Sequence, residues 1–113
     1  MSASAQILPG TLDLLILKAV SLSREHGYGI LLRIEQISGG ALAIEQGALY
    51  PALHRLEHQG FLEGEWGISE NNRRARFYRL TSTGRKRLKE DISAWDRLAA
   101  AMAAALGTTA EEI

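Results

Sequence analysis

The sequence predicts a mostly helical α+β domain made of short helices, one β-hairpin and a long final helix. Apolar residues recur at helical spacing in the first half of the chain. They alternate with other residues along 61–68, and from residue 88 onward they recur in steps of four and three. With 113 residues, 46% of them hydrophobic, the chain can fill one modest core.

Two helices are expected before residue 41. The first spans residues 11–23, with Thr11 as its N-cap. The second follows a turn at residues 26–29 and ends at the two glycines of residues 39–40. Its side chains expected to face the core are Ile30, Leu31, Ile34 and Ile37.

A third helix is expected over residues 46–60. Its inner face carries Leu49, Ala52, Leu53 and Leu56. Its opposite face carries Gly47, Pro51, His54, Arg55 and His58, with Tyr50 on the flank. Because Pro51 lacks an N–H group, we expect this helix to start late or to have a distorted first turn.

A hairpin and a long helix complete the chain. Residues 61–68 and 75–80 are expected to pair around a polar turn at residues 69–72. Thr81 can cap a last helix that runs to about Leu106. Its apolar stripe has the rhythm of a coiled-coil seam and consists of Leu88, Ile92, Trp95, Ala99, Met102 and Leu106. We expect this stripe to pack on a second copy of the chain, and folding back onto its own domain is the alternative.

Positive charge is concentrated between residues 71 and 89, although the net charge of the chain is zero. This stretch contains no acid and eight cations: Arg73, Arg74, Arg76, Arg79, Arg85, Lys86, Arg87 and Lys89. Such a concentration suits a polyanion such as nucleic acid, while a solvated charged surface is the ordinary alternative.

Composition excludes several classes of function. The chain has no cysteine, which rules out disulfides, thiolate zinc sites and a cysteine nucleophile, and is compatible with a cytoplasmic protein. No nucleophile elbow, phosphate loop or metal motif occurs, so we expect neither an enzyme nor a cofactor. Asp13 and Lys18 interrupt the longest apolar stretch, so no signal peptide and no membrane span are expected.

Three helices followed by a hairpin give the element order of a winged helix-turn-helix domain. We expect this domain over residues 8–80, a dimerisation helix over residues 81–106, and tails at residues 1–7 and 107–113. In helix-turn-helix proteins the second helix of the pair enters the major groove of DNA. Here that helix is the third one of the chain.

The expected DNA contacts lie in three segments. Those on the third helix are Gln46, Gly47, Ala48, Tyr50, Pro51, His54 and Arg55, of which Gln46, His54 and Arg55 are expected to set base choice. Those on the wing are Asn71, Asn72, Arg73, Arg74 and Arg76, and the first four arginines of the basic stretch suit phosphates or the minor groove. Tyr28 with its flanking glycines can set a helix N-terminus against a phosphate, although the glycines can equally serve only the turn.

Together these residues resemble the PadR-like transcriptional regulators. The resemblance covers residues 8 to about 106 and rests on HGYGI (26–30), GALYPALHRLEHQGFL (47–62), ENNRRARFYRLT (70–81) and the pair Thr81 and Gly84. It implies a winged-helix DNA-binding domain and a C-terminal dimerisation helix. It also implies a homodimeric repressor that releases double-stranded DNA on sensing a signal such as a small-molecule effector, here of unknown identity. The chain is similar to the short form with a single C-terminal helix.

Other sites have weaker support. His54 and His58 have the spacing of two metal ligands, but no third ligand is evident and no metal is expected. Trp66 and Trp95 could stack on a planar ligand, although packing is the more common role of tryptophan. The alternative function is a protein-interaction module that no longer reads DNA, and the arginine-rich wing argues against it.

Overall fold

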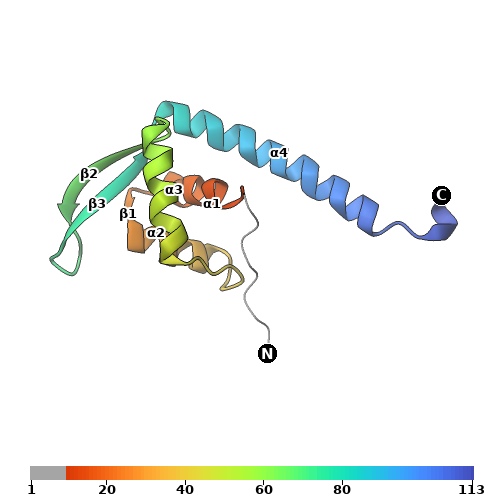
Figure 1. Cartoon of the computed structure of the whole chain (residues 1–113), viewed down its shortest axis with the longest axis horizontal. Coiled ribbons are helices and arrows are strands. Elements are labelled where there is room, and N and C mark those ends of the chain that lie inside the picture. Colours follow the sequence, from red (N-terminus) through yellow and green to blue (C-terminus); the bar gives the residue numbers. More distant parts are fainter. Residues whose placement is uncertain (1–9) are drawn as a thin grey trace.

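The computed structural model describes residues 10–113 as a winged domain from which one long helix projects (Figure 1). The elements are α1 (Leu12–Leu22), β1 (Glu25–His26), α2 (Gly27–Ile37), α3 (Gln46–His58), β2 (Leu62–Ile68), β3 (Arg74–Leu80), α4 (Ser82–Leu106) and the 3-10 helix η1 (Ala110–Glu112). The predicted fold class, with its wing and long final helix, is confirmed. The tail expected at residues 1–7 lies outside the described residues.

One core joins the first three helices to the root of the hairpin. Its fully buried large side chains are Ile16, Leu17, Ile30, Ile34, Leu49, Leu53, Leu56 and Leu62. The seven of these residues that lie in α1, α2 and α3 follow the helical spacing of the sequence, and Leu62 is the first residue of β2. Ile37 was expected to face the core but is 44% exposed, because it is the last residue of α2 and lies at the edge of the core.

α3 is helical from Gln46 through Pro51, so the expectation of a late or distorted start is wrong. A proline inside a helix removes the hydrogen bond to the carbonyl four residues earlier, which here is that of Gly47. Gly47 is exposed near the beginning of the helix, where water can satisfy this carbonyl. The helix therefore loses one bond without being interrupted.

Arg33 joins α2 to the end of α1. Its guanidinium donates to the carbonyl oxygens of Ala19 at 2.9 Å and Ser23 at 2.8 Å, and to the Glu25 carboxylate at 3.0 Å. It therefore occupies carbonyl groups that the end of a helix leaves free. This contact holds β1 close to both helices.

The wing belongs to a three-stranded antiparallel sheet in the order β1-β3-β2. β2 and β3 pair from Leu62 opposite Leu80 to Ile68 opposite Arg74. β1 pairs with the other edge of β3 and was not predicted. A strand of two residues is too short to show a periodicity in the sequence. β1 forms because it pairs with β3.

The tip of the wing is a closed turn. The Ser69 amide donates to the Arg73 carbonyl at 2.8 Å, and the Asn72 amide donates to the Ser69 carbonyl at 2.9 Å. Asn72 has a φ of 57°, a left-handed conformation that asparagine tolerates better than most residues. The polar turn predicted at this place is confirmed.

α4 begins at a tight joint with the corner between α3 and β2. Thr81 Oγ1 accepts from the Gly84 amide at 2.9 Å and donates to the Gly60 carbonyl at 2.6 Å. A Cβ atom on Gly84 would collide with the carbonyl oxygen of Phe61. Only glycine therefore lets the first turn of α4 approach the chain this closely.

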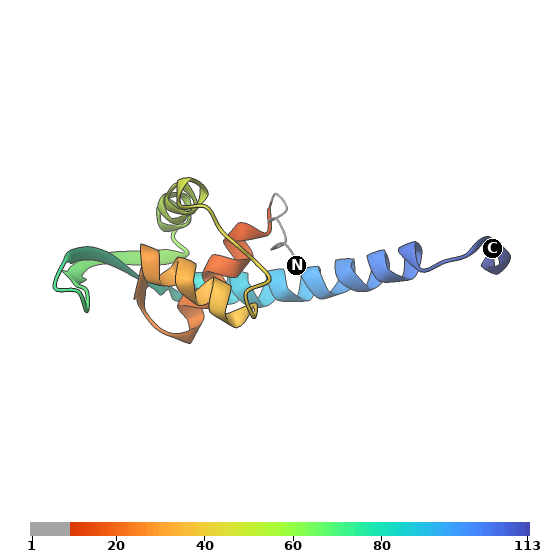
Figure 2. The same ribbon diagram turned by 90° about the horizontal axis from the view of Figure 1, so that it is seen from below.

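The first part of α4 packs against α1, and its remaining turns project away from the domain (Figures 1 and 2). The radius of gyration is 16.4 Å, whereas a compact chain of this length would have about 13 Å. The wing tip and the far end of α4 lie at opposite ends of the molecule in both views. Leu88 was predicted to belong to the dimerisation stripe, but it is buried in the core of its own chain. The exposed part of the stripe begins at Ile92.

We expect Gly84→Ala to destabilise the fold by about 1–3 kcal/mol, because the added methyl group overpacks the joint. Urea unfolding followed by circular dichroism measures this change. Gly47→Ala is the matched control, since it is also a helical glycine but its added Cβ would meet no atom within 4 Å. It should leave stability unchanged or raise it by about 0.5–1 kcal/mol. Equal effects of the two substitutions would contradict the tight joint.

Candidate nucleic-acid interface

α3 presents one whole side to solvent. Its buried side consists of Leu49, Ala52, Leu53 and Leu56. The opposite side consists of the exposed residues Gly47, Pro51, His54 and His58, and Gln46 and Ala48 are exposed in the first turn. None of these six residues is acidic, and three of them, Gly47, Ala48 and Pro51, have no long side chain. This side therefore allows a polyanion to approach the helix backbone closely.

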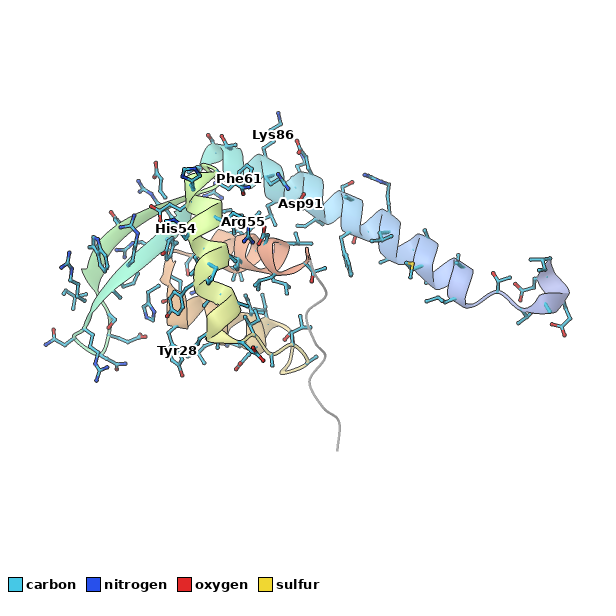
Figure 3. All side chains as sticks on the ribbon, in the orientation of Figure 1. Tyr28, His54, Arg55, Phe61, Lys86 and Asp91 are labelled. Atoms are coloured by element: carbon cyan, nitrogen blue, oxygen red, sulfur yellow. The ribbon has the colours of Figure 1, made fainter. Side chains whose placement is uncertain are left out.

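Arg55 lies on the flank of α3 that faces α1 (Figure 3). Its Nη2 atom is 2.6 Å from Oδ1 of Asp13, and half of its side chain is exposed. His54 leaves the helix on a different side (Figure 3). Arg55 is therefore engaged within the chain and is not grouped with the other predicted base-reading residues.

Two tyrosines lie where α3 meets the start of α2. The ring of Tyr50 covers Gly27 so closely that a Cβ there would be 2.6 Å from its Cε1 atom. Tyr28 is half-exposed on the first turn of α2. That turn is capped by His26, whose Nδ1 atom accepts from the Gly29 amide at 3.1 Å. The glycines at 27 and 29 thus serve close packing at the beginning of α2.

The eight cations of the basic stretch fall into two groups. Three have an acidic partner: Arg76 with Glu57, Arg79 with Glu63, and Arg87 with Asp91. Within residues 10–113 the other five have none: Arg73, Arg74, Arg85, Lys86 and Lys89. The wing therefore offers two arginines free of acidic partners, Arg73 and Arg74, where the sequence led us to expect four.

Arg76 connects the wing to α3. Its Nε atom is 3.3 Å from Oε1 of Glu57, and its Nη2 atom bonds the second oxygen of the same carboxylate. The side chain passes over Gly64, where a Cβ would lie 2.6 Å from Nε. The hydrogen bond with Glu57 raises the pKa of Arg76 above its ordinary value. A bidentate pair of this kind fixes orientation as well as distance.

A hollow of about 610 Å³ lies between the wing and the start of α2. The predicted residues that line it are Tyr28, Tyr50, Asn71, Arg73, Arg74 and Arg76. Trp66 lines it too, although its sequence position gave it only a packing role or a ligand-stacking role. The structure thus brings the wing tip, α2 and one flank of α3 together, and places the remaining predicted residues of α3, except Arg55, on the adjoining exposed side.

A sequence model of the transcriptional regulator PadR-like family matches residues 16–90, which is more than half of the chain. The chain belongs to this family.

Individual relatives and solved structures agree with this assignment. A transcriptional regulator of Mycobacterium tuberculosis is 40% identical over 65 residues, which are 58% of this chain and 60% of the relative. The crystal structure of a PadR family transcriptional regulator from Eggerthella lenta has a TM-score of 0.74 and 30% identity, covering 88% of this chain and 85% of the other. A transcriptional regulator from Clostridium thermocellum has a TM-score of 0.74 and 28% identity, covering 82% and 87%.

The PadR-like family settles the class of protein: a transcriptional regulator, and not an enzyme. The sequence resemblance to this family is therefore confirmed. Among residues 10–113, no helix is both long enough and apolar enough to cross a membrane.

Tyr78 provides a test of the packing beneath the Arg76 and Glu57 pair. Burial raises the pKa of its phenol, and the nearby Glu57 carboxylate raises it further. The unfolded chain therefore ionises first, so the stability that Tyr78 contributes is present below about pH 10 and is lost as the pH rises above that value. We expect the melting temperature of Tyr78→Phe to fall less between pH 9 and 11 than that of the wild type, in parallel thermal scans. Identical slopes would contradict the burial of this phenol.

Proposed function

We propose that the chain binds operator DNA sequence-specifically as a homodimer and represses transcription at the promoter it occupies. The observation that supports this proposal most is the continuity of two surfaces. The exposed, acid-free side of α3 adjoins a hollow whose wall includes Arg73 and Arg74, the two wing arginines that have no acidic partner among residues 10–113. A DNA duplex presents base edges that the polar side chains of α3 can bind, and phosphates that the wing arginines can bind.

On this proposal α3 enters the major groove with its exposed side. Gln46 and His54 hydrogen-bond base edges, while Gly47, Ala48 and Pro51 keep the surface low enough for the helix to approach. Tyr50 contacts the sugar-phosphate backbone from the flank. Arg55 keeps its bond with Asp13 and contributes to the potential near the phosphates, so base choice falls mainly to Gln46 and His54.

The wing and the start of α2 bind the backbone on either side of α3. Arg73 and Arg74 contact phosphates or the adjacent minor groove, together with Asn71 at the tip, and Asn72 holds the turn that presents them. Tyr28 approaches a phosphate from the first turn of α2. Because these contacts carry no base information, they set affinity and register.

We expect replacing Arg73 and Arg74 together by alanine to weaken binding to specific and random duplexes alike. Each lost phosphate contact lowers the magnitude of the log–log salt slope by about 0.9, so a dimer that loses four should lose about 3 to 4. Fluorescence anisotropy of labelled duplexes over a salt series measures both quantities.

Arg79→Ala is the control for this pair, because Arg79 is bonded to Glu63 at 2.9 Å. It should change neither affinity nor slope. A loss confined to one DNA sequence, with the slope unchanged, would overturn the proposed role of the wing tip.

The exposed side of α4 supports the homodimer. Its apolar side chains are Ile92, Trp95, Leu98, Ala99, Met102 and Leu106, of which the large ones are 39% to 78% exposed. Leu98 was not in the predicted stripe, although it lies three residues after Trp95 and four before Met102. Trp95 and Leu98 also line a groove of about 300 Å³ against Leu14 of α1 and Gly10, which precedes α1. A second α4 packed there would cover a stripe that one chain leaves open.

Repression then follows from occupancy of the promoter by the dimer. Two copies of α3 read two half-sites about one helical turn apart, and bound protein excludes the transcription machinery from overlapping DNA. The protein acts in the cytoplasm. A small-molecule effector of unknown identity releases it from the DNA. These two features are drawn from the resemblance to the family.

We expect Trp95→Asp to turn a dimer into a monomer, because it places a charge in the middle of the apolar stripe. Sedimentation equilibrium gives the mass, and circular dichroism checks that the helices remain. The Arg97→Ala variant should stay dimeric, because the side chain that it removes bonds to Ser93 on the same helix. A monomeric wild type, or a dimeric Trp95→Asp variant, would rule out the seam.

A further inference from the structure

We propose that Trp66 is a DNA-contact residue whose indole packs against the deoxyribose wall of the minor groove. The inference rests on the proposed function, because it takes the wing to lie beside a duplex. It assigns a binding role to an apolar residue on a surface that is otherwise defined by its charge.

The first observation is the exposure of large apolar side chains on one face of the wing. Trp66 is 58% exposed and Ile68 is 64% exposed. They alternate along β2, so both lie on the face that turns toward α3, where Leu62 is buried at the root. Tryptophan is usually well buried, and two such residues side by side on a small domain indicate a contact surface.

The second observation is that arginines flank the indole. Trp66 lies directly opposite Arg76 on β3, and Ile68 lies opposite Arg74. The guanidinium carbon of Arg74 is 4.4 Å from the centroid of the ring, and that of Arg76 is 5.6 Å from it. Both distances are typical of cation–π contacts. On this face of the wing, each exposed apolar side chain of β2 therefore has an arginine of β3 beside it.

Arg76 acts here as a positioning residue. Because Glu57 of α3 holds its guanidinium through both carboxylate oxygens, the cation beside the indole cannot swing away freely. Trp66 is thus oriented by contacts that lead back to the helix proposed to read the bases. An exposed tryptophan with a fixed orientation is suited to binding with little loss of conformational entropy.

The alternation of apolar and cationic groups matches the sugar-phosphate backbone. The walls of the minor groove present the C–H faces of deoxyribose between successive phosphates. The uncovered part of the indole and Ile68 can contact the sugars, while Arg74 and Arg73 reach the flanking phosphates. The same hollow contains Tyr50 of α3, so the contact would be continuous with the major-groove surface.

Single-tryptophan variants test this contact directly. The chain has two tryptophans, so Trp95→Phe leaves Trp66 as the sole reporter and Trp66→Phe leaves Trp95. Acrylamide quenching is measured with and without a labelled mixed-sequence duplex of about 30 base pairs at low salt, long enough for two half-sites. Anisotropy of the label reports binding independently. We expect the quenching constant of Trp66 to fall several-fold at saturation, while that of Trp95 does not change.

Affinity separates this contact from a purely electrostatic one. Trp66→Ala should bind the duplex at least about fivefold more weakly, as expected for an interface tryptophan, while its salt slope stays that of the wild type because no charge is lost. Arg74→Ala should instead flatten the slope.

The possible failures are distinguishable. If the duplex binds saturably but the quenching of Trp66 is unchanged, the sugar contact is wrong and the DNA-binding function stands. If the wild type binds no duplex even at low salt, both the contact and the proposed function are wrong.

Discussion

The contact between Gly84 and the carbonyl of Phe61 determines how α4 leaves the winged domain. No side chain separates the two segments, and Thr81 fixes them through its bonds to Gly60 and Gly84. α4 has 25 residues, and at about 1.5 Å per residue a rotation of about 10° at the joint would move its far end by about 6 Å. In a dimer joined along α4, this joint would therefore set the distance between the two copies of α3.

Internal partners decide which charges of the basic stretch can meet another molecule. Arg73 and Arg76 are three residues apart, yet one lies at the wing tip without an acidic partner and the other is held by Glu57. The bond between Arg76 and Glu57 also makes α3 and the wing a single unit. Their orientations relative to a duplex are then coupled, so a change in one alters how the other is presented.

The sequence predicted the four main helices and the hairpin because each has a local periodicity of apolar residues. Burial confirms this periodicity in α1, α2 and α3, whereas the apolar stripe of α4 beyond Leu88 and the wing residues Trp66 and Ile68 are exposed. Features that depend on distant partners were not predictable in this way. Arg55 meets Asp13, 42 positions away, and β1 exists only by pairing with β3. The prediction that Ile37 faces the core was wrong, because helical spacing indicates which side of a helix faces inward but not where the core ends. At the candidate interface the sequence predicted the residue types. It did not predict that Arg55 and Arg76 would each form an ion pair with an acidic residue of the same chain.

The placement of charge also gives this neutral chain an electric dipole along its long axis. Arg73 and Arg74 lie at the wing tip, and Glu111 and Glu112 lie in η1 at the opposite end (Figure 1). With no net charge, the molecule feels little overall attraction to a distant polyanion. Within a Debye length of about 8–10 Å, however, the wing end is drawn in and the C-terminal end is repelled. Electrostatic forces therefore favour encounters in which the wing end faces the DNA. They disfavour encounters in which the C-terminal end approaches the DNA first.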